Sequence, residues 1–328
     1  MDFDLTEDQQ EIKRVARDLL GARSTMADVR KAAEARRYHD ALWNEIVALG
    51  WPGIAVDERH GGQGLGAVEL AVLLEELGYA CAATPFLSTA IVASVLQSAG
   101  TDRQRERWLP GLVSGEVRAG VGPGGLVLDG VDAEIVLLIT GDRAVLLESF
   151  DSEPFDTIDP TRRFARVSGD GELLESDAVA RFAVAVASEV VGVCQRALEM
   201  TLDYVKERKQ FGVPVGSFQA VSHRCAEMLL QTESARSAGY FGAWAADADP
   251  SRLAEGAALA AAAAATGGRM VTASAIQNHG GIGFTWEADV HWFYKRAELD
   301  RALLGGSSRH HAALARIAAQ RLAAAAPA

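Results

Sequence analysis

"RKQFGVPVGSFQ" occupies residues 208–219 and begins with two cations, an amide, an aromatic ring and a glycine in five consecutive positions. The stretch follows the C-terminal end of a long predicted helix, where cations often compensate the helix dipole. Dipole compensation explains Arg208 and Lys209 but leaves the aromatic ring and the glycine unexplained. A guanidinium pairs well with a pyrophosphate, and the amide of Gln210 can bind further phosphate or ribose oxygens. With Phe211 as a flat face for an adenine, the cluster favours a ligand that carries a pyrophosphate.

A second unusual stretch, "IQNHGGIGF", occupies residues 276–284. Gly280 and Gly281 fit the end of a helix, where glycine stops the helix and turns the chain. Three glycines within four positions are more than one cap requires, and a backbone without side chains lets a ligand approach closely. Gln277 lies one turn earlier, where it can orient such a ligand, whereas a lone histidine such as His279 is more often structural.

The composition argues against several classes of protein. The chain has 328 residues, enough for two or three domains, and its net charge of −12 argues against nucleic acid or an anionic membrane as a partner, because phosphate binding needs a basic face. The longest apolar run, residues 257–265, is too short for a membrane span of about 20 residues. The acidic start "MDFDLTEDQQ" lacks the apolar core of a signal peptide, and the three isolated cysteines indicate no disulfide or structural zinc, so we expect a cytoplasmic chain.

The predicted elements run in the order helices, a small β unit and helices again. Helical periodicity dominates to about residue 116, and short β-branched runs bounded by Gly and Asp follow. Long amphipathic helices then extend to the end of the chain. We therefore expect an N-terminal helical domain over 1–116, a β domain over 117–177 and a helical bundle over 178–328.

Local signals predict where some of these elements begin and end. Thr6 and Gln9 fit a capping box, and Gly50 fits the end of a predicted helix. "FARVSGDGELL", residues 164–174, is typical of a hairpin with its turn at residues 169–171.

Two further motifs have ordinary explanations. "GGQGLG", residues 61–66, lacks the GxGxxG spacing of a dinucleotide site and follows a polar stretch rather than a buried strand, so we expect an interhelical loop. Ser307 and Ser308 lie near His310 and His311, but no GxSxG elbow accompanies them. Serines before a helix are usually caps, and we expect the two histidines to be solvated.

The two stretches described first, in this order and on these helices, resemble the acyl-CoA dehydrogenase family. "LTEDQQEIKRVARDLL" is similar to the first helix of that family, and "LGWPGIAVDERHGGQGLGAVELAVLLEELG" to its N-terminal helix-loop-helix. The resemblance covers almost the whole chain. It implies a mostly α fold with an N-terminal helical domain, a shortened middle β domain and a C-terminal four-helix bundle.

In that family FAD lies across a subunit interface, and the resemblance implies that this chain holds the ADP portion of a flavin seated mostly in a neighbouring subunit. The matching positions are Arg208, Gln210, Phe211, Gln219, Gln277, Gly280 and Gly281. The implied reaction is α,β-dehydrogenation of an acyl-CoA thioester, in which a carboxylate takes the α-proton while flavin N5 accepts the β-hydride.

The chain departs from the family at three places. The usual base lies in a "YEGT"-like stretch, but this chain has "LLGGSS", with Gly305 at the position of the glutamate. The alternative position for the base, on the helix before "RKQFG", is Phe182. The "LTEP…GSD" stretch that cradles flavin and acyl chain is missing, and "VGPGGLVLDG" follows "EVRAG" instead. The catalytic base is therefore not identified in this chain.

This combination resembles the short degenerate subunit of the α2β2 acyl-CoA dehydrogenases that shorten steroid side chains. The resemblance implies a longer homologue as the partner in a heterotetramer, an acyl-CoA substrate, FAD bound only at mixed interfaces and no activity in the chain alone. Two alternatives stay open: a non-catalytic scaffold or binding protein that kept the fold and lost FAD, and a homomeric enzyme with an unrecognised base. Glu189 is an acid on the same helix as Phe182, but surface charge explains it better.

Overall fold

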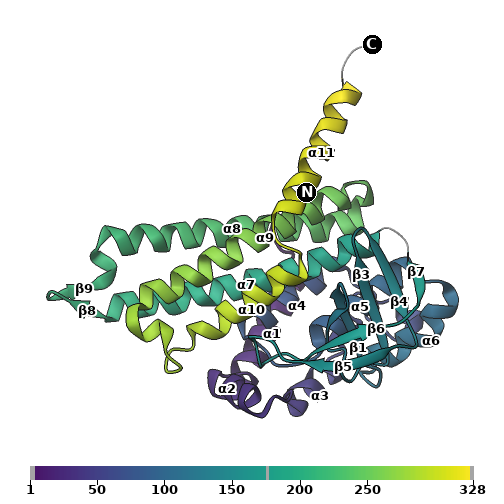
Figure 1. The fold of residues 1–328 in the computed structure, drawn as a ribbon, viewed down its shortest axis with the longest axis horizontal. Coiled ribbons are helices and arrows are strands. Elements are labelled where there is room, and N and C mark those ends of the chain that lie inside the picture. The colour runs from purple at the N-terminus through teal and green to yellow at the C-terminus, as the bar shows by residue number, and fades with distance from the viewer. Residues whose placement is uncertain (1–3, 175–176, 326–328) are drawn as a thin grey trace.

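Helices form both ends of the chain, and a sheet lies between them in the sequence (Figure 1). The computed structural model describes residues 4–174 and 177–325. The N-terminal helices are α1 (Glu7–Arg23), α2 (Met26–Ala35), α3 (Asp40–Ala48), α4 (Ala67–Tyr79), α5 (Phe86–Ala99) and α6 (Asp102–Val113), with the 3-10 turns η1 (Trp51–Gly53) and η2 (Glu58–His60) between α3 and α4.

Caps and glycines end these helices where the sequence predicts. Thr6 Oγ1 accepts from the Gln9 backbone N–H at 3.2 Å, and Gln9 Oε1 accepts from the Thr6 N–H at 3.0 Å, which confirms the capping box. Gly50 follows α3 in the left-handed conformation with φ +71°. Residues 61–66 form the predicted loop before α4.

The strands of the described residues form one main sheet. They are β1 (Ala119–Pro123), β2 (Leu126–Leu128), β3 (Ile135–Thr140), β4 (Arg143–Leu147), β5 (Asp151–Phe155), β6 (Phe164–Ser168) and β7 (Glu172–Leu174). Their order across the sheet is β5-β6-β2-β1-β3-β4-β7. β1 and β3 are parallel, and the other neighbours are antiparallel.

The predicted hairpin over residues 164–174 is wrong. Both strands exist, but β6 pairs with β2 and β5, while β7 pairs with β4 at the opposite side of the sheet. A three-residue connection spans at most about 14 Å, so the sheet curls until its two sides approach each other. A Cβ on Gly169 would lie 2.8 Å from the carbonyl oxygen of Ser149, which shows how closely the β4–β5 and β6–β7 connections pass.

The C-terminal part is the predicted four-helix bundle. Its helices are α7 (Asp177–Glu207), α8 (Gln219–Ala248), α9 (Leu253–His279) and α10 (Val290–Leu303), joined by a small hairpin and the 3-10 turns η3 (Val215–Ser217), η4 (Pro250–Arg252) and η5 (Gly280–Phe284). α11 (Ser308–Ala325) projects from one side of the bundle (Figure 1). The fold class is confirmed, whereas the three domain boundaries stay a prediction.

Glycines bring the N-terminal helices into direct contact with the bundle. A Cβ on Gly78 of α4 would lie 2.1 Å from the carbonyl oxygen of Glu189, and a Cβ on Gly192 of α7 would lie 1.7 Å from that of Glu75. Only glycine permits this separation, so α4 and α7 cross with their backbones touching.

Five buried charged side chains join the β unit to the bundle. Arg296 Nε lies 2.8 Å from Asp159 Oδ2, and its Nη1 lies 3.0 Å from Glu189 Oε1. Arg162 pairs with Glu189 and Asp300. The assignment of Glu189 to the surface is therefore wrong, because its carboxylate is buried between two guanidinium groups. Burial raises the pKa of Asp300 to about 7.

The remaining expectations about the chain's environment concern membranes and cysteines. None of the helices in the described ranges combines the length and apolar character that crossing a bilayer requires. The cysteines Cys81, Cys194 and Cys225 are unpaired and buried.

Candidate functional site

The "RKQFG" stretch forms a tight hairpin at one end of the bundle (left in Figure 1). β8 (Lys209–Gln210) and β9 (Val213–Pro214) pair through a two-residue turn, with φ +53° at Phe211 and +81° at Gly212. A left-handed backbone is costly for a residue with a side chain. The Phe211 ring is nevertheless 93% exposed, with one edge-on contact to Phe218 at 6.3 Å. An exposed ring held in this way is available to a ligand or a partner.

The hairpin forms one wall of a cavity of about 650 Å³. Ligand sites commonly occupy about 300–1,000 Å³. The lining comes from the end of α7, the hairpin, the start of α8, the end of α9 and η5, and comprises Tyr204, Arg208, Gln210, Phe211, Val215, Phe218, Ala220, Val221, Arg224, Gln277, Asn278, His279, Gly280, Gly281 and Ile282. The structure therefore brings together six of the seven positions that the sequence predicts. The seventh, Gln219, is exposed at the first residue of α8, next to the lining residue Ala220.

The cavity carries positive charge in an acidic protein. Arg208 and Arg224 both line it, and none of the described lining residues is Asp or Glu. Sequence reasoning missed Arg224, although a helical signal exists: it lies three and four positions after Val221 and Ala220, which line the same cavity. Two guanidinium groups without a carboxylate favour an anionic ligand.

The glycine-rich wall leaves its backbone open. Gly280 ends α9 with φ +64° and ψ −142°, and a Cβ on Gly280 or Gly281 would meet nothing within 4 Å. The space beside these two backbone positions is therefore free of the chain's own atoms and open to a ligand. Gly283 differs, because a Cβ there would lie 2.4 Å from the Ile276 carbonyl oxygen. The residues present fit a ligand with a pyrophosphate, sugar oxygens and a flat ring.

His279 is structural, as expected. Its Nδ1 lies 2.7 Å from the carbonyl oxygen of Ala275, and its ring stacks on Tyr204 with the centroids 4.5 Å apart. Burial lowers the pKa of His279 below its usual value. The neutral, stacked ring holds the end of α9 against α7.

Neither family position for a base carries a carboxylate. Gly305 is exposed with φ +71° at the end of α10, where its N–H donates to the Ala302 carbonyl at 3.0 Å. Phe182 lies on α7, and its side chain is 1% exposed in the hydrophobic core. Glu189 is engaged by Arg162 and Arg296, so it is not a free base.

The region that differs from the family's flavin-cradling stretch is a tight turn. β1 and β2 meet at Gly124 and Gly125, whose φ values are +60° and +80°. A Cβ on Gly122 would lie 2.1 Å from the Leu126 carbonyl oxygen, so the two strands are in contact. No extended loop separates β1 from β2 in the described residues.

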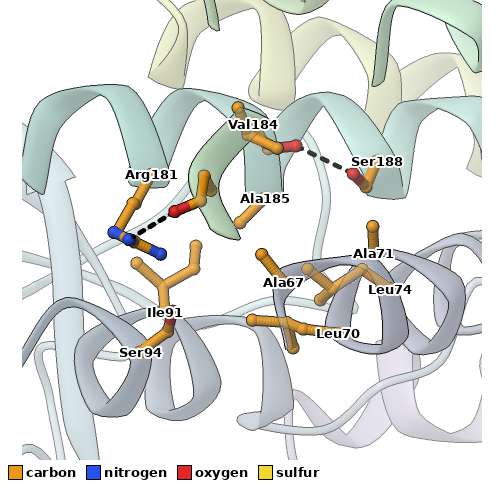
Figure 2. A pocket seen from close by; sticks show the side chains of 11 residues that line it. Ala67, Leu70, Ala71, Leu74, Ile91, Ser94, Arg181, Val184, Ala185 and Ser188 are labelled. Atoms are coloured by element: carbon orange, nitrogen blue, oxygen red, sulfur yellow. Dashed lines mark hydrogen bonds between the residues drawn. The ribbon is translucent and has the colours of Figure 1, made fainter. Parts of the chain in front are cut away.

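A hollow between α4, α5 and α7 is too small for an acyl chain (Figure 2). Its volume is about 20 Å³, enough for about one water molecule. Figure 2 shows Arg181 and Ser188 turned back to the protein backbone. Arg181 Nη2 donates to the Ala246 carbonyl at 3.0 Å, and the Ser188 hydroxyl donates to the Val184 carbonyl at 2.9 Å.

The two histidines of the serine–histidine segment lie in different environments. His310 is buried, with Nε2 2.8 Å from the Leu304 carbonyl oxygen, so the expectation that it is solvated is wrong. His311 is exposed, as expected. Within residues 4–174 and 177–325, no group of three or more His, Cys, Asp or Glu side chains is arranged to hold a metal ion.

Comparison with known proteins gives consistent matches along the chain. Residues 6–116 match the family described as "Acyl-CoA dehydrogenase, N-terminal domain", and residues 173–319 match "Acyl-CoA dehydrogenase, C-terminal domain". The chain is similar to acyl-CoA dehydrogenase IpdE2 of Mycolicibacterium smegmatis, with 33% identity over 310 residues that cover 92% of this chain and 96% of that protein.

Solved structures show the same fold. A structure described as "Tcur3481-Tcur3483 steroid ACAD G363A variant" matches with TM-score 0.87 and 27% identity, covering 97% of this chain and 99% of that chain. A chain in the structure of the ChsE4-ChsE5 complex from Mycobacterium tuberculosis matches with TM-score 0.85 and 25% identity. The match covers 100% of this chain and 100% of that chain.

Proposed function

The chain belongs to the acyl-CoA dehydrogenase family, and from that premise we propose that it is one subunit of a heteromeric FAD enzyme, in which it binds the ADP portion of a flavin seated in a longer partner subunit. The observation that carries this proposal is the cavity at the end of the bundle. It unites both family motifs and contains two guanidinium groups, with no carboxylate among its described lining residues.

Each wall of the cavity has a separate role toward FAD. The Arg208 guanidinium binds the pyrophosphate, and the Phe211 ring packs against the adenine. The amides of Gln210 and Gln277 bind ribose or phosphate oxygens. Gly280 and Gly281 let the ligand approach the backbone, and Gln219 lies at the start of α8 beside the cavity. Bound FAD supplies the hydride acceptor for α,β-dehydrogenation of an acyl-CoA thioester.

The partner supplies what this chain lacks. Gly305 and Phe182 occupy the two family positions for the base, and neither side chain can take a proton. The tight β1–β2 turn supports a chain without its own flavin seat. The base and the flavin seat therefore belong to the longer homologue.

Exposed aromatic rings on the hairpin and after the glycine-rich wall support a covered surface in the complex. Phe211, Phe284 and Trp286 are 93%, 76% and 70% exposed, and the last two follow Gly280 and Gly281 in the sequence. Large exposed apolar side chains are typical of interaction sites. The mixed-subunit interface covers them.

The descriptions of the relatives support a proposal for the substrate class. One matched structure is described as a steroid acyl-CoA dehydrogenase and another as a complex of two named chains. We extend both features to this chain as a proposal: an acyl-CoA that carries a steroid side chain, in lipid catabolism, and an α2β2 assembly in the cytoplasm.

Arg208→Ala is expected to weaken FAD binding to the co-expressed complex by about 1.5–3 kcal/mol, the range for a hydrogen bond to a charged group. The fold is expected to be retained, because the contact of Arg208 with α7 is its backbone N–H to the Tyr204 carbonyl at 2.8 Å. The measurement is the FAD-to-protein ratio of the purified complex. Arg143→Ala, at an exposed cation on β4, is the matched control. Unchanged FAD retention in the Arg208 variant would remove Arg208 from the site.

Trp286 is expected to become inaccessible to acrylamide when the partner binds. Of the six tryptophans, Trp286 is exposed, Trp244 is half-buried, and Trp43, Trp51, Trp108 and Trp292 are buried. The difference in quenching between the wild type and Trp286→Phe isolates this ring, and it should fall at least about threefold from the free chain to the complex as the ring is buried. An equal difference in both states would show that Trp286 lies outside the interface.

A further inference from the structure

Arg224 lines the same cavity as the hairpin and lies in the first turns of α8. Its Nη1 donates to Asn278 Oδ1 on α9 at 3.4 Å. Asn278 is 8% exposed, and its Nδ2 faces Cys225 Sγ at 3.5 Å and Met228 Sδ at 3.9 Å. Because the amide nitrogen of Asn278 donates to the two sulfur atoms, its amide oxygen faces Arg224. A buried side chain from a second helix therefore orients the guanidinium.

The other donors of Arg224 are not taken by carboxylates. Within the described residues, no Asp or Glu forms an ion pair with Arg224. The nearest acid along α8, Glu227, accepts from Gln231 Nε2 at 2.9 Å instead. Arg236, three turns further along α8, differs, because it pairs with Glu75 at 3.2 Å and with Glu233. A guanidinium has five N–H donors, so Arg224 keeps several for a ligand.

The cavity is thus lined by two guanidinium groups from different elements. Arg208 enters from the end of α7, and Arg224 enters from α8. A pyrophosphate has two phosphate groups, and a forked guanidinium suits each of them. We infer that Arg224 is the second phosphate-binding residue of the cavity, held in place by Asn278. This inference rests on the proposed function, since it assigns a contact within the same FAD site.

The inference predicts a selectivity that a structural role for Arg224 would not produce. Adenosine has the adenine and the ribose of FAD, which this cavity binds, but neither phosphate nor flavin ring. Loss of a phosphate contact therefore weakens FAD binding and leaves adenosine binding unchanged. Loss of the local fold would weaken both.

The test uses the complex co-expressed with the longer homologue, stripped of flavin and titrated separately with FAD and with adenosine. Arg224→Ala is expected to raise the dissociation constant for FAD by about tenfold to a hundredfold, the loss expected for a charged hydrogen bond, with the constant for adenosine unchanged. Arg224→Lys, which keeps the charge but not the fork, is expected to give an intermediate value for FAD. Arg143→Ala is the matched control and is expected to bind both ligands as the wild type does.

The outcomes separate this inference from the proposed function. If Arg208→Ala weakens FAD binding and Arg224→Ala does not, the inference is wrong and the proposed function stands. If neither variant weakens FAD binding, or the wild-type complex binds no FAD, the proposed function fails as well. Equal weakening of FAD and adenosine by Arg224→Ala would also overturn the inference, because it would indicate a structural role.

Discussion

Arg296→Ala is expected to lower the free energy of unfolding by about 3–5 kcal/mol, because removing one partner of a buried ion pair leaves uncompensated buried charge. Arg296 is 1% exposed and pairs with Asp159 and Glu189, and its Nη2 donates to the Thr161 hydroxyl at 2.6 Å. The substitution leaves both carboxylates buried with one cation fewer. Since the free energy of unfolding of globular proteins is about 5–15 kcal/mol, this loss is a large part of the stability. Urea denaturation followed by circular dichroism measures it.

The matched control is Arg30→Ala, which removes an arginine from an ion pair at the surface. Arg30 pairs with Asp289 at 2.6 Å, but its side chain is 41% exposed. Exposed pairs contribute about 1 kcal/mol or less, so this variant is expected to unfold close to the wild type. A loss as small for Arg296→Ala as for Arg30→Ala would contradict the role of the buried charges in joining the β unit to the bundle.

The deficit of Arg296→Ala is also expected to depend on pH. Burial raises the pKa of Asp300 to about 7 in the folded state, whereas an unfolded aspartate titrates near about 4. Arg296 lowers the pKa of Asp300, so the variant takes up the Asp300 proton at a higher pH than the wild type does. As the pH falls, the variant therefore loses uncompensated charge first and regains stability relative to the wild type. The deficit should therefore shrink between about pH 8 and pH 5.

Much of the fold is predictable because its signals are local. The capping box at Thr6, the glycine after α3 and the amphipathic period of α7 each depend on residues a few positions apart. The site motifs are local as well. "RKQFG" gathers three cavity residues in four positions, and all five residues of "QNHGG" line the cavity.

The features that sequence reasoning missed depend on contacts between distant residues. The prediction of a hairpin over residues 164–174 is wrong because its two strands pair with other strands: β6 pairs with β2 and β5, and β7 pairs with β4. Glu189 looks like a surface charge until Arg162 and Arg296, far away in the sequence, enclose it. Arg224 contacts Asn278 on another helix, and the sequence alone does not show this contact.

The chain purified alone is expected to carry little or no FAD and to show no acyl-CoA dehydrogenase activity. Its cavity offers contacts for the ADP portion, but the described residues contain no free carboxylate at either family base position, and the β1–β2 turn is tight. Half of a site gives a ligand only part of the contacts that offset its lost freedom. Co-expression with a longer homologue should give a yellow heteromer that turns over.

Gly305→Glu is the internal control for this expectation, and it should not restore activity to the chain alone. Gly305 has φ +71°, a conformation that strains a residue with a side chain, and a Cβ there would lie 3.0 Å from Arg309 Nη1. The flavin seat would still be missing even if the carboxylate were accommodated. Activity in the lone variant would show that the chain needs only a base.

The most direct test of the account is the amount of FAD per protein, measured by absorbance, in the chain alone and in the heteromer. The account predicts almost none in the chain alone and one FAD for each mixed pair of subunits in the complex. A colourless complex with every longer homologue would favour a scaffold that has lost FAD. Stoichiometric FAD together with turnover in the chain purified alone would contradict the account.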